Sequence, residues 1–451
     1  MSYYTASGEP PGRWQGRGSA SLGLSGEVDP AMMDRLYMRR IGPSGELLGK
    51  AKPAKDEDYA VAAYQAAHPF ASAVELAEVR AKARGAVQAK VPYYDLTISA
   101  AKSVSVLHAS LKVASQEAYR RGDPTTAGRL SAEADAIEAD LEACARFAVE
   151  RAEAEACYTR TGHHSATTGE WRDGAGLVAA SFVHHISRDG DPQLHVHVAI
   201  AALVQRADGV DEAWRVPDFR ALHNQRLSIA AQVDRKMESR LLARGYSMVP
   251  RTDGNGSEID GVPHEVMELF SSRRASLTPQ VKEMAAAYKA KYGHEPSGRT
   301  LWLMGQQAAQ RTRRPKSEAK KIHGDGQDAT EAERLAAWEK QTAARELTVL
   351  SGVHQLVRGE MGRPGIEITD DLREMAARAA VAEVQKHHSV WSLAELRFEV
   401  ARALPPGASA EDVRQVADLA VTPGSGCDVL LVTRQATDCN ISAGCCPARY
   451  V

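Results

Sequence analysis

Apolar positions recur at helical spacing on either side of a stretch in which they alternate with other residues. Residues 126–153 give the clearest helix, because Leu130, Ile137 and Leu141 fall near one face. The other segments with helical spacing are 73–90, 101–121, 218–244 and onward to about 340, and 369–420. Much of the chain is therefore expected to be helical.

Strand-like alternation covers residues 93–99, 156–162, 176–187 and 194–204. Gly190, Asp191 and Pro192 separate the last two segments, which predicts an antiparallel pair joined by a short loop. Residues 1–30 contain six glycines and three prolines, so we expect a loop with little regular structure there. The last thirty residues show no convincing pattern.

Composition narrows the class of protein. The chain has 451 residues, enough for two or three domains, and 43% hydrophobic and 25% charged residues are typical of a globular protein. It has no apolar run of the roughly 18 residues that a membrane span needs, so we expect no membrane insertion. Its six cysteines lack the paired CxxC spacing of zinc sites and are expected to be free thiols in a reducing cytoplasm.

The charge balance restricts how the chain can bind nucleic acid. Lys and Arg total 56 against 58 Asp and Glu, a net charge of −2, so a nucleic-acid footprint has to be a local patch. Residues 311–321 supply such a patch, with six Lys or Arg in eleven residues. The alternative for this run is a solvated linker. The chain has no GxxxxGK[ST] phosphate loop, so it is not itself an ATP-driven motor.

Histidines concentrate in the predicted strands. The chain has 15 of them, and six fall in the 35 residues that end at His197. Side chains of residues 194–204 alternate between two faces, which puts His195 and His197 together on the face opposite the apolar one. The preceding strand ends in His184 and His185, and strand parity alone does not say which of them shares that face.

Three such imidazoles bind a divalent transition metal and leave positions open for a substrate oxygen. A metal so held acts as a Lewis acid on a phosphoryl oxygen. The alternative is three satisfied or solvent-facing histidines on a hairpin.

Two further residues carry candidate chemistry. Asp95 lies on the polar face of the strand 93–99, where a carboxylate can orient a site histidine or accept a proton from a nucleophile. The alternative is an edge residue that caps a turn. Lys102 lies where this strand passes into a helix and is a candidate phosphate ligand, with a solvated lysine as the alternative.

Three segments carry a resemblance to a known family: YYTASGEPPGRWQGRGSASLGLSGEVD from Tyr3, YDLTISAAKSVSVLHA from Tyr94, and HHISRDGDPQLHVHVAI from His184. Together they resemble the relaxase domain of MobF-class conjugative relaxases. These are histidine-hydrophobe-histidine nucleases that nick plasmid DNA at an origin of transfer. The resemblance is collinear from Tyr3 to about Pro315.

This resemblance implies an α+β fold, with an antiparallel sheet carrying a three-histidine metal site, flanking helices and a helical C-terminal extension. It implies a divalent metal ion (Mg²⁺, Mn²⁺, Zn²⁺ or Ni²⁺) and places its ligands at His184, His195 and His197. The acidic residue that activates the nucleophile or orients a histidine falls on Asp95. The implied nucleophiles are Tyr3 and Tyr4, and the expected DNA contacts are Lys102, Arg188, Arg311, Arg313, Arg314 and Lys316.

The implied reaction is strand- and site-specific transesterification on single-stranded DNA at an origin of transfer. It forms a 5′-phosphotyrosine intermediate, in the cytoplasm, with relaxosome accessory and coupling proteins as further partners. The expected domains are a relaxase domain over 1–315, a basic and polar linker over 316–345, and a helical extension over 346–451. That extension resembles the start of a helicase-linked region, and its tail is expected to be irregular.

The sequence departs from the family in two ways. Relatives begin with an additional strand and an earlier tyrosine pair, which have no counterpart before Tyr3. Ala101 replaces the proline usual before Lys-Ser, a change that we expect to be tolerated. The first departure supports a second hypothesis, a catalytically impaired remnant that binds single-stranded DNA. A third hypothesis is a three-histidine iron oxygenase or hydrolase that acts on small molecules.

Overall fold

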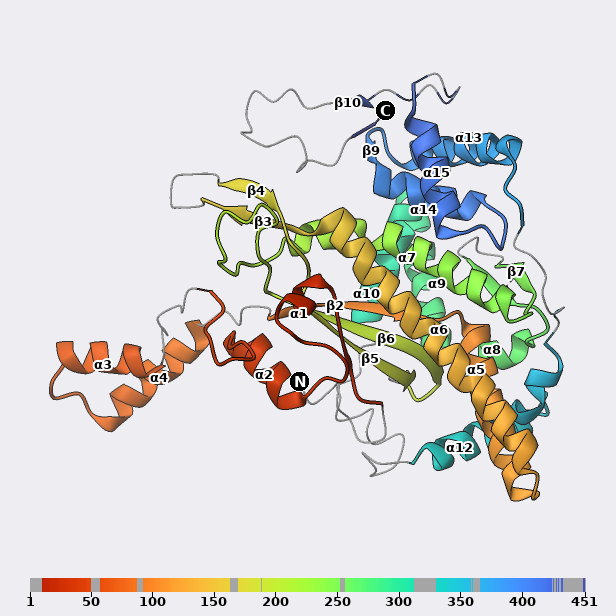
Figure 1. Cartoon of the computed structure of the whole chain (residues 1–451), viewed down its shortest axis with the longest axis horizontal. Coiled ribbons are helices and arrows are strands. Elements are labelled where there is room, and N and C mark those ends of the chain that lie inside the picture. The colour runs from red at the N-terminus through yellow and green to blue at the C-terminus, as the bar shows by residue number, and fades with distance from the viewer. Residues whose placement is uncertain are drawn as a thin grey trace.

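The centre of the molecule is a four-stranded antiparallel sheet with the strand order β1-β5-β6-β2 (Figure 1). Its strands are β1 (Arg13–Gln15), β5 (Ala179–Ile186), β6 (Pro192–Ala201) and β2 (Tyr93–Ser99). The computed structural model describes residues 10–49, 57–86, 92–162, 169–187, 189–251, 256–311, 330–357, 359, 366–423, 425, 427, 429, 431–432 and 449–450.

The register of the sheet brings the histidine-bearing positions together. Strands β5 and β6 form the predicted antiparallel hairpin, with His184 opposite His195. On the other side of β6, Thr97 of β2 lies opposite His197, and Asp95 lies opposite Ala199. Because alternate residues of a strand share a face, this register puts the three histidines and the polar face of β2 on the same side.

The opposite face of the sheet is covered by α5 (Lys102–Arg120) and α6 (Pro124–Ala156), and α7 (Phe219–Ala243) packs on α6 (Figure 1). Helix α6 begins where the Asp123 carboxylate accepts a 3.0 Å hydrogen bond from the amide of Thr126. The predicted stripe of this helix, which includes Ile137 and Leu141, is buried in the main core with Val196 of β6.

A smaller core lies on the histidine side of the sheet, where α2 (Pro30–Arg39) packs on Trp14 and Phe182. The expectation of a loop over residues 1–30 was wrong for residues 13–21, where β1 and α1 (Arg17–Ser21) lie. The glycines of this stretch permit close packing. Gly16 has a φ of 87°, and a Cβ at this position would lie 2.3 Å from the carbonyl oxygen of Leu177.

Short strand pairs and helices surround the sheet. Helices α3 and α4 pack on each other, as do α9 and α10, while α12 and η1 contact α5. The bounds are β3 (Tyr158–Thr161), β4 (Glu170–Asp173), β7 (Met248–Pro250), β8 (Ser257–Ile259), α3 (Glu57–Ala67), α4 (Ala73–Ala86), α8 (His264–Leu269), α9 (Ser272–Tyr292), α10 (Gly298–Arg311), α12 (Glu331–Ala344) and η1 (Leu350–Gln355). Three of these strands, β4, β7 and β8, were not predicted.

The C-terminal region forms a helical extension with its own core around the fully buried Trp391. Its elements are α13 (Asp370–His387), β9 (Trp391–Ser392), α14 (Leu393–Ala403), α15 (Ala410–Val421), β10 (Leu431–Val432) and β11 (Arg449–Tyr450). Helix α14 docks on α7, where Arg235 contacts Glu238 at 2.7 Å and donates to the carbonyl of Ala401.

The α+β fold class with its antiparallel sheet and helical extension is therefore confirmed. The division into domains at 315 and 345 stays a prediction, and α12 lies inside the stretch expected to be a linker. Among the described residues, none of the helices combines the length and apolar character that a membrane crossing requires.

Candidate metal centre and nucleic-acid cavity

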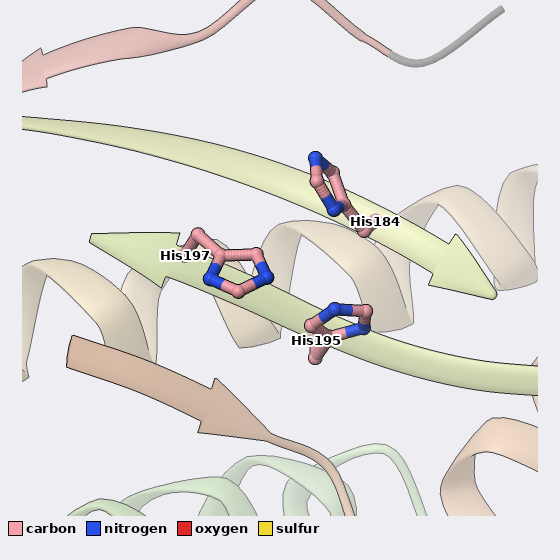
Figure 2. A group of neighbouring side chains, drawn as sticks. All are labelled: His184, His195 and His197. Atoms are coloured by element: carbon pink, nitrogen blue, oxygen red, sulfur yellow. The ribbon is translucent and has the colours of Figure 1, made fainter. Parts of the chain in front are cut away.

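Three histidines converge on one face of the sheet, His184 from β5 and His195 and His197 from β6 (Figure 2). Their ring centroids are separated by 5.0 to 5.4 Å. One ring nitrogen of each lies within 4.8 Å of the corresponding atoms of the other two. All three residues are at least nine-tenths buried.

Two of these rings make hydrogen bonds through Nδ1, and these bonds set their tautomers. Nδ1 of His197 lies 3.0 Å from both carboxylate oxygens of Asp95, and Nδ1 of His195 lies 2.8 Å from the carbonyl oxygen of Gln193. Because a carboxylate and a carbonyl only accept, Nδ1 carries the proton in each ring and Nε2 keeps its lone pair. Two nitrogens are thus prepared as metal ligands, and the donor set fits a divalent transition metal.

The neighbouring His185 points to the opposite face of the sheet. Its Nε2 lies 2.8 Å from a carboxylate oxygen of Glu138 on α6, and its ring stacks on that of His108 on α5. Burial lowers the pKa of His108 to about 3, so the His108 imidazole is neutral at physiological pH. The ambiguity between the two adjacent histidines is thus resolved geometrically, since only His184 lies with His195 and His197.

A cavity of about 1130 Å³ extends from His195 and His197 toward α7, α9 and α10. This volume exceeds the roughly 300–1,000 Å³ of a small-molecule site, so the cavity has room for part of a polymer. Acidic side chains also reach the cavity, among them Asp191 and Glu258. The basic residues that line it are Lys102, Arg251, Arg273, Arg274 and Lys282.

Lys102 supports the turn that leads into β6. Its Nζ donates to the carbonyl oxygen of Pro192 and to Oε1 of Gln193, both at 2.9 Å. Burial lowers the pKa of Lys102, partly offset by the nearby Asp191 carboxylate. The backbone carbonyl of Gln193 contacts Nδ1 of His195, so Lys102 and His195 share a neighbour in this turn. The expected phosphate contact of Lys102 stays a prediction.

Sequence reasoning missed the residues that anchor the same turn from outside. The Asp191 carboxylate accepts hydrogen bonds from the amide of Ser272 at 3.0 Å and from its hydroxyl at 2.8 Å. Trp338 of α12 donates from its indole nitrogen to the carbonyl oxygen of Gly190 at 2.8 Å. The Gly-Asp-Pro pattern indicated the turn, but its partners are distant in the sequence.

Tyr3, Tyr4, Arg188, Arg313, Arg314 and Lys316 lie outside the described residues. Arg311 is the last residue of α10, and its side chain is also outside the description. The nucleophile and the basic run therefore stay predictions.

Comparison with known proteins adds a family match. A family model described as TrwC relaxase matches residues 1–122 and 125–344. The multifunctional conjugation protein TraI of Escherichia coli is 26% identical over 279 residues, which are 61% of this chain and 12% of that protein. TraI of Escherichia coli strain K12 is 25% identical over the same length. The chain thus spans 12% of the length of these relatives.

Solved structures of a conjugative relaxase TrwC are also similar to this chain. One is a complex with oriT DNA without metal, at 21% identity and a TM-score of 0.48, covering 75% of this chain and 92% of that one. Another is a copper-bound complex with oriT DNA, at 22% identity and a TM-score of 0.49, covering 77% and 94%.

Proposed function

Because the chain belongs to the TrwC relaxase family, we propose that it is a conjugative relaxase that cuts and rejoins single-stranded DNA at an origin of transfer. The observation that carries this proposal is the buried histidine triad, two members of which, His195 and His197, line a large cavity that five Lys or Arg side chains also reach. A phosphodiester reaction needs charge stabilisation next to a groove that holds the strand, and the two are adjacent here.

His184, His195 and His197 would hold the metal ion, which when bound supplies a Lewis acid for a non-bridging phosphate oxygen. Imidazole donors favour Zn²⁺ or Ni²⁺ over Mg²⁺ or Mn²⁺. Asp95 and Gln193 contribute by keeping the protons on Nδ1 of His197 and His195. We propose Asp95 as a positioning residue on this ground, because both of its oxygens face His197.

The covalent step would use Tyr3 or Tyr4. The phenolic oxygen attacks the phosphorus in line and loses its proton, the bond to the 3′ oxygen breaks, and a 5′-phosphotyrosine and a free 3′-hydroxyl result. One ester replaces another, so rejoining needs no ATP. A phenol with a pKa of about 10 is almost wholly protonated at neutral pH, so this attack needs a proton acceptor.

A covalent-adduct assay tests this activity and its nucleophile. Single-stranded oligonucleotides that tile the DNA flanking the gene are incubated with the chain and each divalent metal. We expect one oligonucleotide to form an adduct, and mass spectrometry to place it on Tyr3 or Tyr4. The Tyr3→Phe/Tyr4→Phe double variant should form none, whereas Tyr93→Phe, a change in β2, should behave as the wild type.

The outcomes separate the remaining hypotheses. An adduct on Tyr93 or Tyr94 would refute the nucleophile assignment. Tight binding of DNA without an adduct under any metal would favour the DNA-binding remnant. Family membership argues against the three-histidine oxygenase, and oxygen uptake without DNA would be needed to revive it.

The cavity predicts a steep salt dependence of DNA binding despite the net charge of −2. Each phosphate that the protein neutralises contributes about −0.7 to the slope of log K against log salt for single strands. The Arg273→Ala/Arg274→Ala double variant should therefore lower the magnitude of this slope by about 1.4. Fluorescence anisotropy over a salt series measures it, with the exposed Arg80→Ala as control, and an unchanged slope would exclude these arginines as phosphate ligands.

We further propose that the chain acts in the cytoplasm with relaxosome accessory and coupling proteins. The proposed organisation is a relaxase domain over 1–315, a linker over 316–345 and a helical extension over 346–451. The family match ends at residue 344, which supports a boundary near the end of α12.

A further inference from the structure

A second cluster of potential metal ligands lies on the face of the sheet opposite the histidine triad. His108 of α5, Glu138 of α6 and His185 of β5 each offer one ligand atom, and these atoms lie within 4.8 Å of one another. The cluster joins three elements that are far apart in sequence. The proposed relaxase chemistry does not use it.

The spacing of these atoms suits a tetrahedral ion. With bonds of about 2.0–2.1 Å, two ligands of tetrahedral zinc lie roughly 3.3 Å apart. Nε2 of His185 lies 2.8 Å from Oε2 of Glu138, and Nε2 of His108 lies 3.7 Å from the same oxygen. Shifts of about half an ångström would bring both pairs to the tetrahedral value, and the two imidazole nitrogens lie within 4.8 Å of each other.

The environment of His108 also indicates a ligand. The residue is 95% buried, and its Nε2 makes no hydrogen bond with any described residue. A buried polar nitrogen without a hydrogen bond costs free energy, whereas coordination to a metal would satisfy it. This nitrogen faces the Glu138 carboxylate, the charged member that an ion would neutralise.

We propose that His108, Glu138 and His185 form a second metal site, which binds a zinc-class divalent ion and ties β5 to α5 and α6. The site takes two imidazoles and one carboxylate, a common donor set for zinc. Its fourth position opens on a cavity of about 440 Å³, whose lining includes Lys112, Asp135 and Trp338. Because His185 follows His184 directly, the ion would stabilise the strand β5, which also carries His184 of the triad.

Metal stoichiometry tests the proposal without depending on DNA cleavage. The full chain is prepared with Cys427, Cys439, Cys445 and Cys446 changed to serine, so that these thiols cannot add zinc. Equilibrium dialysis against buffered zinc, followed by elemental analysis, counts the ions bound per chain. We expect two for this parent protein and one for the His195→Ala/His197→Ala variant.

Two substitutions address the new site while preserving its packing. His108→Phe keeps a ring that can stack on His185, and Glu138→Gln keeps an acceptor for the hydrogen bond from His185. Each should reduce the count from two ions to one. His264→Ala is the matched control, because His264 lies 3.7 Å from Glu268 as an exposed histidine–glutamate pair, and it should leave two.

Thermal unfolding with and without zinc provides the second readout. Zinc should raise the melting temperature of the His195→Ala/His197→Ala variant, and adding His108→Phe should abolish that rise. The proposal is overturned if the parent protein and His108→Phe bind equal amounts of zinc. It is equally overturned if the parent binds one ion that the triad variant loses, because the cluster is then only a hydrogen-bonded pair beside a stacked ring.

Discussion

Asp95→Asn separates the two roles that a carboxylate beside the metal centre can have. The Asp95 oxygens lie 3.0 Å from Nδ1 of His197, and an asparagine can keep an oxygen there as acceptor. The substitution therefore preserves the tautomer of His197 and removes the negative charge. If Asp95 serves to orient and polarise His197, the loss will be one of metal affinity.

The solvent exposure of Asp95 sets the expected size of this loss in metal affinity. Removing an outer partner of a metal-bound histidine costs about 10–100-fold in metal affinity. The side chain of Asp95 is 35% exposed, so water screens its charge, and we expect the lower end, about tenfold or about 1.4 kcal/mol. Asp95→Ala removes both carboxylate oxygens and keeps the hydroxyl of Thr97, 3.3 Å from Nδ1, and it should cost roughly 30-fold in metal affinity.

Competition with a chelating dye at fixed pH measures the affinity of each variant for the metal. The single-turnover rate of adduct formation is then measured as a function of metal concentration. For a positioning residue, saturating metal should restore the rate of Asp95→Asn close to that of the wild type. Asp173→Asn, in β4, is the control and should change neither quantity. Metal affinity within twofold of the wild type, with a rate that stays low at saturating metal, would refute the positioning role and make Asp95 the proton acceptor.

Two further predictions concern parts of the chain outside the metal centre. Arg235→Met should lower the free energy of unfolding in urea by about 3–5 kcal/mol, because it leaves the Glu238 carboxylate buried and uncompensated. Adding Glu238→Leu should recover most of this loss. A loss below about 1 kcal/mol for Arg235→Met alone would contradict the prediction. Burial raises the pKa of Cys144 and Cys157 to about 12, so neither forms thiolate at pH 8. Iodoacetamide should label the half-buried Cys427 and spare these two until the chain unfolds, and equal labelling in the native protein would show that the thiols are accessible.

Most of the arrangement of the histidine triad could be predicted because its geometry is mostly local. Alternation along β6 is enough to put His195 and His197 on one face, and the short turn before them brings β5 alongside. The long helix α6 was equally accessible, since its apolar stripe repeats over many turns. Both features depend on periods within one element or one hairpin.

The walls of the cavity could not be predicted in the same way. Arg273 and Arg274 reach it from α9, and Arg251 reaches it from the residue after β7, placements that no period in the sequence reports. The prediction of a loop around Gly16 failed for a related reason. Glycines suggested a loop, whereas here the missing side chain lets two backbones approach closely, as a compact sheet edge requires.

Strand parity alone could not decide whether His184 or His185 lies on the same face as His195 and His197. The register between β5 and β6 is regular up to the pair of His184 with His195 and shifts between His184 and Ile186. As in an ordinary strand, the two consecutive residues point to opposite faces, His184 to the triad and His185 to His108 and Glu138. A one-residue slip of β5 would exchange these two histidines, so the contact between His185 and Glu138 favours the register in which His184 completes the triad.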